Sequence, residues 1–198
     1  ERLPSATCIA IGPGLGRSRE LQTLLRRLLS LATCPLVIDA DGLNNLADLS
    51  DWSARVAFRP VVLTPHPGEW QRLCGVPASD RRAQSAAAID LARQTGIAVV
   101  LKGSQTLVTD GDTVVLNDSG TPAMATGGSG DVLTGLITAL ICQGLAVRDA
   151  AHLGVHVHGR AAEIAAQQLQ THVVLPTQLI AHLPQAFRAA QRGTLAGN

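Results

Sequence analysis

The chain has 198 residues, of which 46% are hydrophobic and 16% are charged, so it can bury a core and global disorder is excluded. Only 2% of the residues are aromatic, and 16 basic residues stand against 15 acidic ones. This composition argues against a nucleic-acid binder, which needs a basic surface or stacking aromatic side chains. No apolar run reaches the roughly 18 residues of a membrane span. The four cysteines are widely spaced and indicate neither a zinc site nor a disulfide framework. We expect one cytoplasmic domain over residues 1–198.

Short β-rich runs alternate with helical segments along the chain. The predicted strands are Thr7–Ile11, Leu36–Asp39, Val61–Thr64 and Ala98–Lys102, followed by a hairpin of Gln105–Thr109 and Thr113–Leu116. The predicted helices run from an N-cap at Ser18 to Leu31, from Ser79 or Asp80 to Thr95, and over Asp131–Gln143, Val147–Thr171 and Pro176–Arg192. This order predicts an α/β fold, with a mostly parallel central sheet flanked by helices on both faces and a β-hairpin as its antiparallel element.

In such sheets, ligands bind beyond the carboxyl ends of the strands, and five unusual clusters fall there. The first, Gly12–Gly16, reads GPGLG between a strand and a helix. It is a tight turn, a loop that approaches a phosphate, or the start of a dinucleotide fingerprint with Asp39 as the ribose-binding acid. Its G-x-G-x-G spacing departs from that fingerprint. In the second cluster, Asp39 and Asp41 hold Mg²⁺ or a hydroxyl, or cap a short helix that follows.

The third cluster, Thr64–Glu69, contains two titratable groups, and the fourth, Lys102–Thr106, contains one. His66 lies between two prolines and is a candidate donor to a substrate, unless the segment is only a surface loop. Glu69 would lie in the first turn of a helix that begins near Pro67, and would act through metal-bound water. Lys102 is the only lysine among 16 basic residues, which indicates a place where a compact point charge is needed. With Thr106 it would offer a charge and a hydroxyl to a nucleotide phosphate.

The fifth cluster, TGGSGD at Thr126–Asp131, is the most informative one. Its glycines open a helix, whose free N–H groups and partial positive charge make an anion site. Asp131 would be either a cap or a base that takes a proton from an attacking hydroxyl. His152, His156 and His158 are expected to be packing residues of an Ala-rich helix, because no acid lies among them.

Five segments in this order resemble the ADP/ATP-dependent NAD(P)H-hydrate dehydratases, a family with a ribokinase-like fold. They are IGPGLG (Ile11–Gly16), VIDADGLN (Val37–Asn44), LTPHPGE (Leu63–Glu69), LKGSQT (Leu101–Thr106) and TPAMATGGSGDVLTG (Thr121–Gly135). The GGSGD element alone indicates only the superfamily, whereas PHPGE and DADGLN are specific. The family has a further segment ahead of IGPGLG, so the resemblance implies an N-terminally truncated domain whose first strands are missing.

The resemblance implies a hydro-lyase that restores NADH or NADPH from the S form of the hydrated cofactor and consumes ADP, or ATP in place of it. Asp131 would activate the substrate hydroxyl, and Gly14 and His66 would also contact the substrate. Mg²⁺ would travel on the phosphates, with Glu69 reaching it through water. The residues expected to bind the nucleotide are Lys102, Gly103, Ser104, Gln105, Thr106, Gly127, Gly128, Ser129 and Gly130.

Three other functions stay open from the residues alone. They are a ribokinase-like kinase for a small alcohol, a non-catalytic nucleotide-binding fragment, and a dinucleotide oxidoreductase. The resemblance further implies assembly into homotetramers and, in many bacteria, an epimerase domain ahead of this one. We expect neither a nucleic-acid partner nor a membrane partner.

Overall fold

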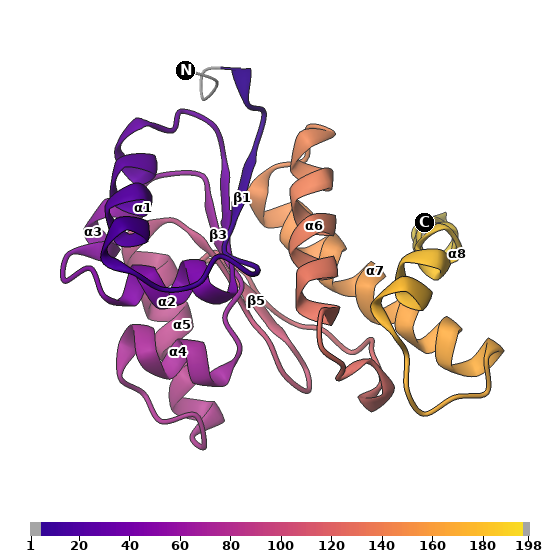
Figure 1. Cartoon of the computed structure of the whole chain (residues 1–198). Helices are drawn as coiled ribbons and strands as arrows, with labels where there is room; N and C mark the ends of the chain where they lie inside the picture. Colours follow the sequence, from indigo (N-terminus) through magenta and orange to yellow (C-terminus); the bar gives the residue numbers. More distant parts are fainter. Residues whose placement is uncertain (1–4, 196–198) are drawn as a thin grey trace.

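A six-stranded sheet with the strand order β1-β2-β3-β4-β5-β6 forms the centre of the computed structural model, which describes residues 5–195 (Figure 1). Its strands are β1 (Ile9–Ile11), β2 (Leu36–Ile38), β3 (Val61–Leu63), β4 (Ala98–Leu101), β5 (Leu107–Thr109) and β6 (Val114–Leu116). The first four strands are parallel, whereas β5 pairs antiparallel with both β4 and β6. The mostly parallel sheet with an added hairpin is therefore confirmed.

Helices cover both faces of this sheet, as the alternation of strands and helices predicts (Figure 1). One face carries α1 (Arg19–Leu31), α2 (Ala40–Ala47), α3 (Trp52–Val56), α4 (Pro67–Cys74) and α5 (Arg81–Thr95). The other carries α6 (Ser129–Cys142), α7 (Val147–Gln168) and α8 (Pro176–Leu195), and a short 3₁₀ turn, η2 (Pro122–Met124), precedes α6. Successive strand residues alternate between the two hydrophobic cores: Leu36 and Ile38 face the first helical layer and Val37 the second.

Some helix boundaries agree with the sequence prediction and others differ from it. Ser18 caps α1 by accepting a hydrogen bond from the N–H of Leu21, as predicted. Gly96 ends α5 in the left-handed conformation. The prediction missed α3, which has five residues. Helix α6 begins two residues earlier than predicted, at Ser129, because the glycine-rich segment already supplies its first turn.

The carboxyl ends of β1 and β2 meet without space for a side chain. Gly12 has φ +135°, and a Cβ atom there would lie 1.7 Å from the carbonyl oxygen of Asp39. Asp39 follows β2 and is the residue before α2, so glycine at position 12 lets the end of β1 pass directly against this junction. No helix in the described part of the chain is long and apolar enough to cross a membrane.

Candidate active site

A buried ion pair joins two neighbouring strand ends. Lys102 follows β4 and Asp39 follows β2, and the Lys102 Nζ lies 2.7 Å from the Asp39 Oδ1. The Asp39 side chain is 1% exposed, and its Oδ2 accepts a hydrogen bond of 2.6 Å from the Thr134 hydroxyl of α6. Both carboxylate oxygens are thus satisfied. Asp39 makes no side-chain cap to α2; instead it ties the sheet to α6.

The TPHPGE segment forms the start of α4 and carries a reciprocal capping box. The His66 Nδ1 accepts hydrogen bonds from the N–H groups of Gly68 (3.0 Å) and Glu69 (3.3 Å). The Glu69 Oε2 accepts one of 2.7 Å from the N–H of His66. Because Nδ1 is an acceptor, the ring proton of neutral His66 belongs on Nε2, and this ring is 56% exposed. The Nε2 of His66 lies 3.3 Å from the Glu69 Oε1, so the exposed ring stands at a helix start instead of a loop and turns this nitrogen toward Glu69.

Glu69 points inward from this helix start. Its side chain is 8% exposed, and Oε2 lies 3.8 Å from the Lys102 Nζ. The structure thus brings Glu69, Lys102 and Asp39 together at the carboxyl ends of the strands, as the sequence predicts for residues at parallel strand ends. One cation stands between two carboxylates, so the cluster carries a net negative charge.

Residues Lys102–Thr106 form the turn between β4 and β5, with Gly103, Ser104 and Gln105 exposed. Arg81 of α5 holds this turn in place. Its guanidinium donates to the carbonyl oxygens of Leu101 (3.0 Å), Lys102 (3.2 Å) and Gln105 (3.3 Å). Partial burial lowers the pKa of Arg81 below its ordinary value. Sequence reasoning missed Arg81, because it belongs to no motif and lies about twenty residues before the turn.

The glycine-rich turn offers unpaired donors beside the ion pair. Gly128 has φ +86° and precedes the first residue of α6. A Cβ on Gly130 would lie 3.4 Å from the Lys102 Nζ, so the turn passes close to that charge. Within residues 5–195, the backbone N–H groups of Gly130 and Asp131 have no hydrogen-bond partner. In the same range, the exposed Asp131 carboxylate has neither a hydrogen bond nor an ion pair.

His158 of α7 lies behind this turn. It is 6% exposed, and its Nε2 lies 2.9 Å from the Ser129 carbonyl oxygen and 3.5 Å from the Ser129 Oγ. Burial lowers the pKa of His158 to about 4; the nearby Lys102 charge acts in the same direction and the hydrogen bond to Ser129 opposes both. The prediction of a packing histidine is confirmed for His158, whereas His152 is exposed.

The GPGLG loop is held by Asp41, whose Oδ2 accepts a hydrogen bond of 2.9 Å from the N–H of Gly16. Gly14 is exposed at φ +66°, and a Cβ there would meet nothing within 4 Å. This open loop stays available for a ligand. The alternative of a dinucleotide fingerprint is disfavoured, because Asp39 already has a partner on each carboxylate oxygen.

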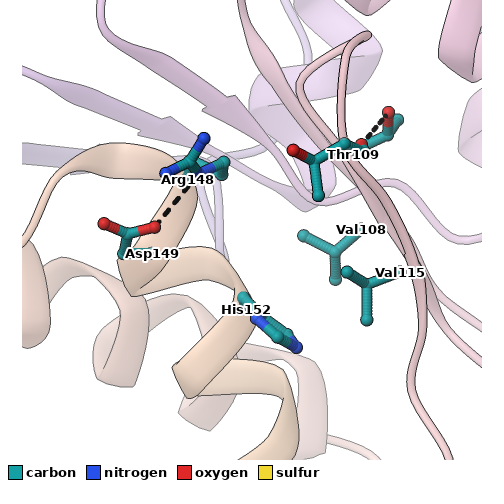
Figure 2. A pocket seen from close by; sticks show the side chains of 7 residues that line it. Val108, Thr109, Val115, Arg148, Asp149 and His152 are labelled. Atoms are coloured by element: carbon teal, nitrogen blue, oxygen red, sulfur yellow. Dashed lines mark hydrogen bonds and ion pairs between the residues drawn. The ribbon is translucent and has the colours of Figure 1, made fainter.

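A small cavity of about 40 Å³ lies elsewhere, between the β5–β6 hairpin and the start of α7 (Figure 2). Figure 2 shows His152 facing Val108 and Val115, with Arg148 and Asp149 joined at the rim by a bond of 3.0 Å. None of the site residues predicted from the sequence lines this cavity. This cavity therefore lies apart from the Asp39–Glu69–Lys102 cluster.

Comparison with known proteins decides the family. A sequence profile described as NAD(P)H-hydrate dehydratase matches residues 1–185. The chain belongs to the NAD(P)H-hydrate dehydratase family. A bifunctional NAD(P)H-hydrate repair enzyme of Thermofilum pendens is 42% identical over 188 residues, which cover 93% of this chain and 36% of that enzyme. The ADP-dependent (S)-NAD(P)H-hydrate dehydratase of Bacillus subtilis is 37% identical over 183 residues, covering 91% of this chain and 63% of the relative.

Solved structures give the same family and name its fold. The B. subtilis ADP/ATP-dependent NAD(P)H-hydrate dehydratase, co-crystallised with ATP/Mg²⁺, superposes with a TM-score of 0.77 at 33% identity over 92% of this chain and 64% of that one. A ribokinase-like superfamily protein of Enterococcus faecalis superposes with a TM-score of 0.78 at 29% identity, over 94% and 64% of the two chains. The ribokinase-like fold is thus confirmed. The chain spans about a third of the bifunctional relative and less than two thirds of the B. subtilis enzyme.

Proposed function

We propose that this chain catalyses the ADP-dependent dehydration of the S form of hydrated NADH or NADPH, releasing AMP and phosphate. One observation carries the proposal: the unpaired carboxylate of Asp131 lies at the start of α6 beside the unpaired N–H groups of Gly130 and Asp131. A general base and an anion site are thereby adjacent. Membership of the NAD(P)H-hydrate dehydratase family supplies the substrate class.

The proposed chemistry explains why a nucleotide is consumed. Hydroxide is a poor leaving group, whereas phosphate is a good one. Asp131 takes the proton of the ring hydroxyl while the hydroxyl oxygen attacks the β-phosphorus of ADP, and the bond between that phosphorus and the departing AMP breaks. Phosphate then leaves the ring carbon, a ring proton is lost from the neighbouring carbon, and the double bond forms. The Gly127–Gly130 turn stabilises the charge on the moving phosphoryl group.

The remaining site residues divide between the two ligands in this proposal. Residues Lys102–Thr106 bind the AMP portion together with Gly130, and the turn 127–130 binds the terminal phosphate. Gly14 and His66 contact the hydrated nicotinamide nucleotide. The exposed loop at Gly14 and the 56% exposed ring of His66 support these contacts.

The residues present fit a Mg²⁺ ion that is carried by the nucleotide. No group of three potential ligands within residues 5–195 forms a protein cage for a metal. Glu69 supplies a hard carboxylate in a cluster with net negative charge, which suits a hydrated Mg²⁺ held mainly by phosphate oxygens. The ion would neutralise charge on the phosphates.

Absorbance at 340 nm tests the proposal directly. The chain is mixed with hydrated NADH, Mg²⁺ and ADP, then with ATP in place of ADP, and NADH formation is followed. A nucleotide-dependent rise is expected, and Asp131→Asn should lower it at least about 100-fold while the Kd for ADP stays within about threefold. Near wild-type turnover of Asp131→Asn would remove this residue from the mechanism. Accumulation of a phosphorylated product would instead favour a small-molecule kinase, and ADP binding without turnover a non-catalytic module.

The wider assembly is proposed from the same family relationship. We infer a homotetramer and an epimerase domain in the same polypeptide, the second because the T. pendens relative is called bifunctional. Light scattering on the purified chain gives its mass directly. A monomer at all concentrations would argue against the tetramer.

A further inference from the structure

The glycine-rich turn is attached to α7 by one buried side chain that the proposed reaction does not use. His158 packs against the inner side of the first turn of α6, with its Nε2 at 2.9 Å from the carbonyl oxygen of Ser129. We propose that His158 is a positioning residue, whose Nε2–H orients and polarises the Ser129–Gly130 peptide so that the Gly130 N–H is aimed at the transferring phosphoryl group. This inference rests on the proposed function.

The geometry of a peptide unit links the two groups. The Ser129 carbonyl and the Gly130 N–H belong to one planar peptide and point to opposite sides of it. A donor that binds the carbonyl strengthens the N–H on the far side, because hydrogen bonds in a chain polarise one another. His158 occupies the inner side of this peptide, and the Gly130 N–H on the outer side has no partner within residues 5–195.

The composition of the turn makes such an anchor necessary. Gly127, Gly128 and Gly130 give the backbone close access to an anion but also a wide choice of conformations. The turn is fixed at two places outside this peptide, by the Thr126 hydroxyl on the carbonyl of Val174 (2.9 Å) and by the Thr134 hydroxyl on Asp39. His158 fixes the peptide that lies between these two anchors.

A neutral donor suits this position better than a charged one. The Lys102 charge acts on His158, and burial together with that charge lowers the pKa of His158 to about 4. The ring therefore stays neutral at pH 7 and keeps one proton. Because the nearest acceptor faces Nε2, that proton belongs on Nε2.

Two substitutions separate positioning from packing. His158→Leu keeps an apolar side chain of moderate size without the donor, whereas His158→Gln retains an N–H donor with a similar reach. His152→Gln is the matched control, since His152 is exposed on the same helix and lines only the cavity of Figure 2. Each variant is assayed for the Kd of ADP and of AMP with Mg²⁺ by calorimetry, for kcat and KM, and for Tm.

The two nucleotides differ in the phosphate that should meet the turn. His158→Leu is expected to raise the Kd for ADP about five- to tenfold relative to the Kd for AMP, and to lower kcat about tenfold or more. His158→Gln should restore both to within about threefold, and His152→Gln should leave them unchanged. Should His158→Leu fail to fold, His158→Asn takes its place. The asparagine side chain is one methylene shorter than that of glutamine, so its amide cannot reach the Ser129 carbonyl equally well.

The outcomes distinguish this inference from the function on which it rests. A lower Tm for His158→Leu, with an unchanged ratio of ADP to AMP affinity and an unchanged kcat, would show a packing role and overturn the proposal. ADP binding by the wild-type chain without turnover removes the dehydratase function, and the affinity ratio still decides the role of His158. Binding of neither nucleotide would overturn both.

Discussion

The Lys102–Asp39 pair permits a prediction with an unequal cost for its two partners. Lys102→Met leaves the Asp39 carboxylate, which is 1% exposed, with only the Thr134 hydroxyl. An uncompensated buried charge lowers the free energy of unfolding by about 3–5 kcal/mol. Asp39→Asn should cost only about 1–2 kcal/mol, because the Lys102 side chain is 19% exposed and lies 3.8 Å from Glu69.

The double variant tests the same pair as a unit. We expect Asp39→Asn/Lys102→Met to cost about 2 kcal/mol less than the sum of the single variants, because neither charge is then left alone. Urea denaturation at pH 7 measures the free energy of unfolding of the wild type, the two single variants and the double variant. Single costs that add within about 0.5 kcal/mol, or a larger cost for Asp39→Asn than for Lys102→Met, would refute the reasoning. Lys102→Met should also weaken ADP binding by roughly 1–3 kcal/mol if its ammonium contacts a phosphate.

Three further predictions concern the surroundings of the site. Gly12→Ala should cost more than about 3 kcal/mol of unfolding free energy, because its Cβ would lie 1.7 Å from the carbonyl oxygen of Asp39. Gly14→Ala has open space around its Cβ and should cost only about 1–2 kcal/mol. Equal costs for the two variants in urea denaturation would contradict this prediction. Arg81→Met should weaken ADP and AMP binding alike, by about tenfold, because the turn after β4 loses its clamp; an unchanged Kd in calorimetry would show that the clamp is dispensable. Burial lowers the pKa of His158 from 6.5 to about 4, so unfolding takes up a proton below pH 6.5, and the free energy of unfolding should fall by about 2–3 kcal/mol between pH 6.5 and 4. Denaturation of His158→Gln over this pH range should lack that component, and an identical pH dependence would argue against a neutral buried ring.

Most of the fold could be predicted from the sequence because the signals for strands and helix ends are local. The strands carry apolar side chains on both faces of the sheet, as Val37 and its neighbours in β2 do. This pattern is typical of a parallel sheet that helices cover on both faces. Caps at Ser18 and Gly96 marked helix ends through backbone hydrogen bonds of nearby residues. The short helix α3 was missed although Asp51 precedes it, because five residues are too few to show a helical period, and Asp51 makes no side-chain cap hydrogen bond.

The candidate site was predictable in its members but not in its pairings. The sequence placed Asp39, Glu69 and Lys102 at or just beyond strand ends, and the structure brings these three side chains together. Which oxygen accepts from which donor depends on side-chain packing between segments 63 residues apart, as in the bond from Lys102 to Asp39. Arg81 and His158 were not assigned a place in the site for the same reason: each reaches it from a helix outside the motifs.

The distribution of satisfied and unsatisfied polar groups supports the proposed place of the reaction. Asp39 is buried and has a partner on each oxygen, and the Ser129 carbonyl is covered by His158. The bonds from Thr134 to Asp39 and from His158 to Ser129 hold the first two turns of α6 against neighbouring elements, which makes their position rigid. In the same first turn, the N–H groups of Gly130 and Asp131 and the Asp131 carboxylate have no partner within residues 5–195. A fixed frame with free groups at its outer edge is what transition-state stabilisation requires, because the donors are then oriented before the charge develops.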